Sequence, residues 1–386
     1  SLREYQQDLN KTVGTDVNKI NAYAKEIQAL NEKIISVEAG VENANDLRDR
    51  RNYLLDELAK LGSINYSEDG NGYVKVRFEG VDLVQGGVVN EIGLYQDLET
   101  GFYTPYWTML ATCDYNEDGE VVVTEEGIKG AKVFDLTAKI SSQFNTDIGS
   151  LKSTLYARGD HFATYRELND INKDGVYEEG WYNQNIEQSI VMNVEAEFDQ
   201  LIHSIVTKIN QILEDAANRA GQPPESTYLR DENGKPYQLF EKIAEEGDWT
   251  VSNIIINSEL RQNPSLLTFR LGEHSEDNET MEQLKKAFEE AVYKLNPNVE
   301  TPVNFVDYYK NLVSQIANTG SVFRAVQANQ TVASDALAGA REQIVGVSSD
   351  EELTNMIMYQ NAYNASSRYI NVISEMLDHI LSTLGR

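Results

Sequence analysis

The chain has 386 residues, enough for two to four domains with at least one substantial core. Its 62 acidic and 33 basic side chains give a formal charge of −29, which disfavours binding to nucleic acids and to anionic lipids. No stretch approaches the roughly 18 consecutive apolar residues of a membrane-spanning helix, and the single cysteine, Cys113, allows no internal disulfide.

The first residues, Ser1–Tyr5, lack the basic segment, apolar run and cleavage site of a secretory signal peptide. We therefore expect a cytoplasmic protein, a protein exported without a cleaved signal, or a piece of a longer chain.

The first 62 residues have a helical period. Their apolar residues recur at spacings of three, four or seven: Val13, Val17, Ile20, Ala24, Ile27, Ile34 and Val37. After a break at Ala39-Gly40 and Asn43–Asn45, a second helix with Leu47, Leu54, Leu55 and Leu58 follows. This pattern predicts a helical hairpin or a kinked rod.

From Ser63 the period changes to two. Residues Tyr73–Glu79 alternate between apolar and polar side chains, and glycine-rich turns flank them. We expect a β region that extends to about Phe144. The next stretch, 150–180, is mixed and favours neither helix nor strand.

Helix returns from about Ile186 to Asn218 and ends at Gly221–Pro224. A second mixed region follows, with a β-like run at Trp249–Ile256 and a helix at Met281–Lys294. From Phe305 to the end, the chain reads as helix almost without interruption.

Together these segments predict a multidomain α+β protein, an elongated helical bundle or coiled-coil rod with β-rich globular inserts. The rod is formed by residues 1–62, 149–220 and 301–345. The inserts are a β-rich domain at 63–148 and an α+β domain at 221–300, and residues 346–386 form a terminal helix.

The terminal helix carries an apolar seam with heptad spacing. Its members alternate at three and four residues: Met356, Tyr359, Tyr363, Ser366, Ile370, Ile373, Leu377, Ile380 and Leu384. Such a seam also suits an ordinary core helix of a bundle. The small and polar residues of its middle, Asn361–Ser367, and its extension to the chain end favour a packing surface shared with other chains.

This segment resembles the C-terminal signature of flagellar axial proteins of the hook-associated family. The similarity lies in Gly346–Glu352, followed by Tyr359–Ile370, where Ser367 stands in place of the usual alanine. Further similar segments lie upstream: Asn45–Leu58, Leu83–Gly86, Leu260–Leu266 and Phe305–Tyr309. Family members begin with a further N-terminal stretch, so the resemblance implies an N-terminally truncated chain.

The resemblance implies a non-enzymatic, extracellular subunit that joins the hook to the filament and is exported by the flagellar type III apparatus. The implied partners are identical subunits, the hook protein, the second junction protein, and an export chaperone bound to about Ser349–Leu384. The interface would comprise Met356, Tyr359, Tyr363, Ile370, Ile373, Leu377, Ile380 and Leu384. Another axial protein, either the second junction protein or a flagellin, and a secreted calcium-dependent adhesin remain alternatives.

One loop fits the spacing of a calcium-binding loop. Its candidate oxygen ligands are Asp114, Asn116, Asp118, Glu120 and Glu125. The flanking residues read as strands, so the alternative is an acidic hairpin tip. Residues Asp170–Gly175 repeat the opening of the motif without its closing glutamate, and a solvated turn is the default there.

The sequence predicts no catalytic site. The histidines His161, His203, His274 and His379 are scattered and none lies in an H-E-x-x-H pattern. There is also no Walker loop, G-x-G-x-x-G or G-x-S-x-G motif. Calcium is the one cofactor that the sequence suggests.

Overall fold

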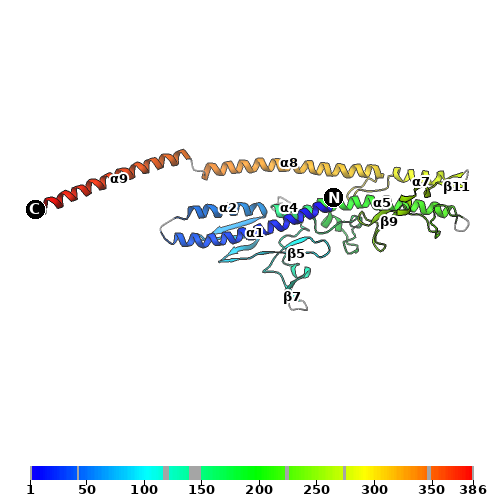
Figure 1. The fold of residues 1–386 in the computed structure, drawn as a ribbon, viewed down its shortest axis with the longest axis horizontal. Helices are drawn as coiled ribbons and strands as arrows, with labels where there is room; N and C mark the ends of the chain where they lie inside the picture. Colours follow the sequence, from blue (N-terminus) through cyan, green and yellow to red (C-terminus); the bar gives the residue numbers. More distant parts are fainter. Residues whose placement is uncertain are drawn as a thin grey trace. The chain divides into compact units, whose positions relative to one another are not determined.

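Figure 1 presents the fold in a computed structural model. The structure describes residues 2–40, 43–115, 121–138, 149–221, 226–272, 275–345 and 349–384. It divides into two units, Ser1–Ser314 and Gln315–Arg386, which are described separately. Among the described residues, no helix combines the length and apolar character needed to cross a membrane.

The first unit begins with two helices that pack along each other, α1 (Leu2–Glu38) and α2 (Asn45–Leu61) (Figure 1). The apolar stripe predicted for the first helix is buried from Val13 to Ile34, whereas Val37 is exposed at the helix end. The prediction of a helical pair is thus confirmed, and its shared apolar face is the start of the core.

A four-stranded antiparallel sheet covers this pair. Its strands follow chain order: β1 (Ile64–Glu68), β2 (Val74–Phe78), β3 (Val81–Gln85) and β4 (Val88–Val89). In the second strand, Val74, Val76 and Phe78 are buried and the residues between them are not, which confirms the predicted period of two. These side chains join the core of the two helices.

Two further hairpins follow. Their strands are β5 (Ile92–Gln96) with β6 (Tyr103–Trp107), and β7 (Cys113–Tyr115) with β8 (Val121–Val123). The β region was predicted to extend to about Phe144, but the last described strand of this region ends at Val123. There the Thr124 side chain accepts a hydrogen bond from the Gly127 N–H and starts the short helix α3 (Glu125–Ile128).

The stretch that the sequence left unassigned, with the residues just after it, combines short helical segments with turns. It contains α4 (Ser150–Arg158), the 3-10 turn η2 (Tyr165–Asn169) and the π-turn η3 (Tyr182–Ile186). The next helix, α5 (Ile190–Arg219), begins four residues later than expected, because the Ser189 side chain caps it by accepting from the Met192 N–H.

Beyond α5 lie small elements. They are β9 (Phe240–Lys242), β10 (Ile254–Ile256), α6 (Ser258–Gln262), η4 (Pro264–Leu266), β11 (Arg270–Gly272), β12 (Ser275–Glu276) and α7 (Asn278–Glu289). The last helix starts before the predicted Met281, because Asp277 caps it and accepts from the Thr280 N–H. It ends at Glu289 rather than at Lys294.

Asparagines attach the long helices to the strands and loops. Asn10, Asn21 and Asn31 project from α1, and Asn210 from α5. Each donates to a backbone carbonyl and accepts from a backbone N–H: Asn10 with Gly101 and Tyr103, Asn21 with Ile92, Asn31 with Val74, Asn210 with Phe240. These pairs satisfy polar groups at the helix–strand contacts and fix their register.

A long helix, α8 (Phe305–Val345), begins in the first unit, where Phe305, Tyr308 and Leu312 are buried. Its remainder and α9 (Ser349–Leu384) make up the described second unit. The α+β class is confirmed. The coiled-coil rod and the domain boundaries stay predictions.

Candidate functional site

The predicted seam on α9 is exposed along the part whose side chains the structure describes. Met356, Tyr359, Tyr363 and Ile370 are 58, 68, 75 and 65% exposed, and Ile373 is 39% exposed. The helix continues to Leu384, but the side chains of Leu377, Ile380 and Leu384 lie outside the described residues. A row of large apolar side chains at heptad spacing is therefore available for contact with another helix.

The second unit exposes further apolar side chains that the sequence reading did not single out. They lie on the later part of α8: Ile316, Val322, Phe323, Val326, Val332 and Leu337. Exposed apolar surface on two long helices is typical of association surfaces, since monomeric proteins rarely leave large apolar patches in water. The sequence did carry a signal for this surface. The helical pattern from Phe305 onward contains apolar residues for which the predicted β-rich inserts offer no matching helix.

The predicted calcium loop is only partly described. Asp114 lies in β7, where its carboxylate accepts from the Thr124 hydroxyl at 3.5 Å, and Glu125 begins α3. Asn116, Asp118 and Glu120 lie outside the described residues. Across the part of the chain that is described, no three His, Cys, Asp or Glu residues gather as metal ligands would.

The second acidic loop is fully described, and its oxygens bind backbone N–H groups. The Asp170 carboxylate accepts from Gly180 and Tyr182 at 3.2 and 3.0 Å. Asn172 Oδ1 accepts from Asp174 and Val176 at 3.1 and 2.9 Å. Turn formation therefore accounts for these residues without a metal.

The same device recurs elsewhere in the chain. Asp69 accepts from the N–H groups two and four residues later, and so does Asp231. The D-x-N-G-like sequences of this protein thus close tight turns in each case that the structure describes.

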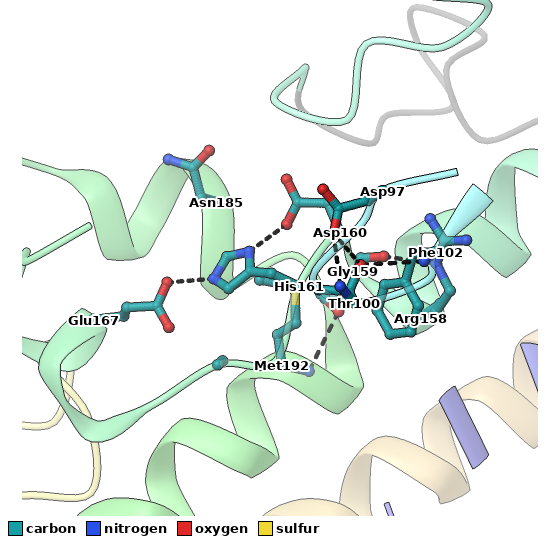
Figure 2. Close-up of polar contacts among 12 residues, drawn as sticks. Asp97, Thr100, Phe102, Arg158, Gly159, Asp160, His161, Glu167, Asn185 and Met192 are labelled. Carbon is teal, nitrogen blue, oxygen red and sulfur yellow. Dashed lines mark hydrogen bonds and ion pairs between the residues drawn. The ribbon is translucent and has the colours of Figure 1, made fainter. Parts of the chain in front are cut away.

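The first unit contains a buried polar cluster that sequence reasoning missed (Figure 2). Arg158, at the end of α4, is 1% exposed and lies over the ring of Phe102. Its guanidinium donates to Asn10 Oδ1 at 2.6 Å and to the Tyr103 carbonyl at 3.0 Å. Burial lowers the pKa of Arg158 to about 10. The cluster ties α1, α4 and β6 together.

His161 is held between two carboxylates in the same cluster (Figure 2). Its Nδ1 lies 2.6 Å from Asp160 Oδ1, and its Nε2 lies 2.5 Å from Glu167 Oε1. Burial opposes protonation of the imidazole, but the two hydrogen-bonded carboxylates outweigh it and raise its pKa to about 10. With both nitrogens engaged, His161 acts as a charged link between α4 and η2.

Glu195 of α5 is a second buried ionisable group. It accepts from the Ala163 N–H at 3.4 Å and lines a cavity of about 390 Å³ together with Arg3, Phe198 and Asp199. Burial raises the pKa of its carboxyl group to about 7. Asp199 accepts from the Tyr165 and Val251 N–H groups, so its carboxylate is bound by backbone.

Comparison with known protein families identifies two matches. Residues 1–226 match the family described as "Flagellar hook-associated protein FlgK helical domain". Residues 343–383 match "Flagellar basal body rod FlgEFG protein C-terminal", which coincides with α9 and its exposed seam.

Curated relatives extend the similarity over the whole chain. Flagellar hook-associated protein 1 of Bacillus subtilis (strain 168) is 25% identical over 389 residues, covering 100% of this chain and 68% of the relative. The protein of that name from Escherichia coli (strain K12) is 23% identical over 412 residues, covering 99% and 72%. Among solved structures, the flagellar hook junction protein FlgK from Burkholderia pseudomallei is 16% identical, with a TM-score of 0.38, over 63% of this chain and 33% of that one.

Proposed function

Because the chain belongs to the FlgK family of flagellar hook-associated proteins, we propose that it is a structural subunit that joins hook to filament by packing its terminal helices against neighbouring subunits. The observation that carries this proposal is the exposure of the α9 seam from Met356 to Ile373. An apolar heptad seam becomes stable when a second helix covers it.

Assembly through this seam fits the composition of α9. The small and polar residues between Asn361 and Ser367 allow close helix approach and hydrogen bonds across a contact. Tyr359 and Tyr363 add amphipathic rings of the kind enriched at protein interfaces. Neighbouring copies, the hook protein and the second junction protein are the proposed partners.

Before assembly, the exposed seam would bind other apolar surfaces too early. We infer that an export chaperone covers it, receiving the apolar face of the amphipathic helix in a groove. Export without a cleaved signal and a location in the extracellular flagellum complete the proposal. No catalytic step is part of it: the buried His161 cluster supports the fold.

The seam can be tested by placing charge on it. In the double variant Ile370→Asp with Ile373→Asp, two carboxylates would have to be desolvated at each helix contact, which is costly. We expect loss of filament attachment and of swimming in a strain that relies on this variant, measured by electron microscopy and motility agar.

The matched control is Thr354→Asp with Asn371→Asp, which adds the same charge to the same helix outside the seam and outside Asn361–Ser367. This control should assemble normally. Normal filaments with the seam variant would refute the proposed interface, provided that both variants unfold in urea at the same midpoint as the parent chain.

A further inference from the structure

The part of the first unit beyond α5 contains a polar cavity of about 460 Å³. Two segments line it, residues 226–237 and the segment from η4 to β11. The lining includes Thr227, Tyr228, Arg230, Thr268 and Arg270. Its volume falls within the range of about 300–1,000 Å³ that is typical of small-molecule sites.

The backbone of both segments directs these side chains to the cavity. Tyr228, Leu229 and Arg230 all line the cavity, and Leu229 is also buried in a core cluster against which Tyr228 packs. Leu229 has a φ of 49°, a conformation that non-glycine residues rarely adopt.

In the other segment, Leu267 and Phe269 pack against the same core cluster, and Leu266, Thr268, Arg270 and Leu271 line the cavity. Contacts with this one core cluster therefore hold both walls of the cavity.

The cavity concentrates positive charge in a strongly acidic chain. Arg230 is only 7% exposed. Its hydrogen bonds all go to neutral oxygens: the carbonyls of Ala217, Gly221 and Gly234, and Asn218 Oδ1. Its Nε has no partner within the described structure. The carbonyls at the end of α5 offset part of the charge, but no described carboxylate pairs with it.

Two of the described acidic groups near the cavity have partners of their own, and Glu276 lies opposite Arg270 in the β11–β12 pair without lining the cavity. Asp277 accepts from the Tyr228 hydroxyl at 2.6 Å and pairs with Arg219 at 3.3 Å. Glu259 accepts from the Tyr237 hydroxyl at 3.2 Å. The described lining comprises two arginines, six residues with a hydroxyl group and three leucines, and none of these residues carries a carboxylate.

We propose that this cavity binds a hydroxylated small anion of the size of an acidic monosaccharide. Arg270, with the charge of Arg230 behind it, pairs with the ligand carboxylate, because guanidinium groups form strong charge-assisted hydrogen bonds with carboxylates. Thr227, Thr268 and the tyrosine hydroxyls bind the ligand hydroxyls. This binding goes beyond assembly of the flagellum and would give the protein a ligand of its own.

The test is isothermal titration of the full chain with glucuronate, with glucose and inorganic phosphate as probes that lack the charge or the sugar hydroxyls. We expect glucuronate to bind at least tenfold more tightly than either. Arg270→Gln should lower the association constant for glucuronate at least tenfold, and Thr268→Ala should lower it several-fold.

Arg261→Gln is the matched control, since Arg261 is an exposed arginine of α6 that does not line the cavity. It should bind glucuronate like the parent chain. The proposal is overturned if glucuronate gives no binding heat, if glucose or phosphate binds equally well, or if Arg270→Gln binds as tightly as Arg261→Gln. None of these variants lies on the α9 seam, so filament assembly should be unaffected.

Discussion

The side chain of Asn31 exchanges two hydrogen bonds with the backbone of Val74: Nδ2 donates to the carbonyl at 2.8 Å, and Oδ1 accepts from the N–H at 3.1 Å. The same Oδ1 accepts from Arg51 Nη1 at 3.0 Å. Asn31 and Arg51 are 0 and 2% exposed. This amide therefore joins α1, α2 and β2 in a core where unpaired polar groups would be destabilising.

Replacing Asn31 by alanine should destabilise the first unit by about 2–4 kcal/mol, because the Val74 N–H and C=O lose their side-chain partner and the buried Arg51 guanidinium loses one of its hydrogen bonds. Urea unfolding followed by circular dichroism measures the change. Asn18→Ala, an exposed position on the same helix, is the control and should change stability by less than about 0.5 kcal/mol. Equal losses in the two variants would contradict the role of Asn31.

The His161 cluster makes the free energy of unfolding depend on pH in the neutral to alkaline range. The pKa of His161 is raised to about 10 in the folded protein from an ordinary 6.5. The folded state therefore keeps a proton that the unfolded chain loses. Its stabilising contribution is complete below pH 6.5, declines as pH rises, and is lost above about pH 10.

We expect His161→Gln to remove this decline, which is on the order of a few kcal/mol. The free energy of unfolding, measured from pH 6 to pH 10 in urea, should fall in the parent chain and stay nearly level in the variant. Parallel slopes in the two proteins would show that His161 is not the group responsible.

Glu195 also makes stability fall as pH rises, but over a lower pH range. Burial raises its pKa from 4.5 to about 7, so the folded state resists ionisation while the unfolded chain ionises. Stability should fall between about pH 4.5 and pH 7. Glu195→Gln keeps the shape without the charge and should stabilise the protein at pH 8 by about 1–3 kcal/mol.

The same substitution at Glu214, an exposed position of α5, is the matched control. Glu214→Gln should change the free energy of unfolding by less than about 0.5 kcal/mol at either pH. At each pH, the free energy of unfolding of Glu195→Gln is compared with that of the parent. A stabilisation at pH 8 that is no larger than the one at pH 5 would contradict the buried-acid assignment.

Calcium binding at the loop from Asp114 to Glu125 stays a prediction. We expect a binding heat at submillimolar to millimolar calcium, the range of extracellular calcium modules. Asp114→Asn with Glu125→Gln should abolish it. Asp174→Asn with Glu179→Gln, the same charge change in the second acidic loop, should leave it intact. If chelator-treated protein gives no binding heat when titrated with millimolar calcium, calcium binding at this loop is refuted.

Much of the helical architecture could be predicted, because the apolar residues on the buried face of a helix recur with the helical period. The stripe from Val13 to Ile34 predicted α1 and its buried side. The alternation in Tyr73–Glu79 predicted β2. The boundaries were less accurate at α5 and α7, where side-chain caps at Ser189 and Asp277 determine the first turn.

The polar contacts of the core were not predicted. Asn10 and Asn31 fall on the apolar stripe of α1, three residues before Val13 and Ile34, and a polar residue at such a position was the available signal. Their partners could not be identified, because Tyr103 and Val74 lie in strands whose register depends on the turns between them.

The sequence was sufficient to predict the α+β class and the apolar seam on the last helix and to show the resemblance to flagellar axial proteins, since periodicity and motifs are local properties of the chain. The fold alone brought Arg158 to Asn10, placed His161 between two acids, and gathered Arg230 and Arg270 around one cavity. The first and third of these arrangements join residues that are remote in the chain, and the energies of all three arise from burial and pairing that exist only after the elements pack.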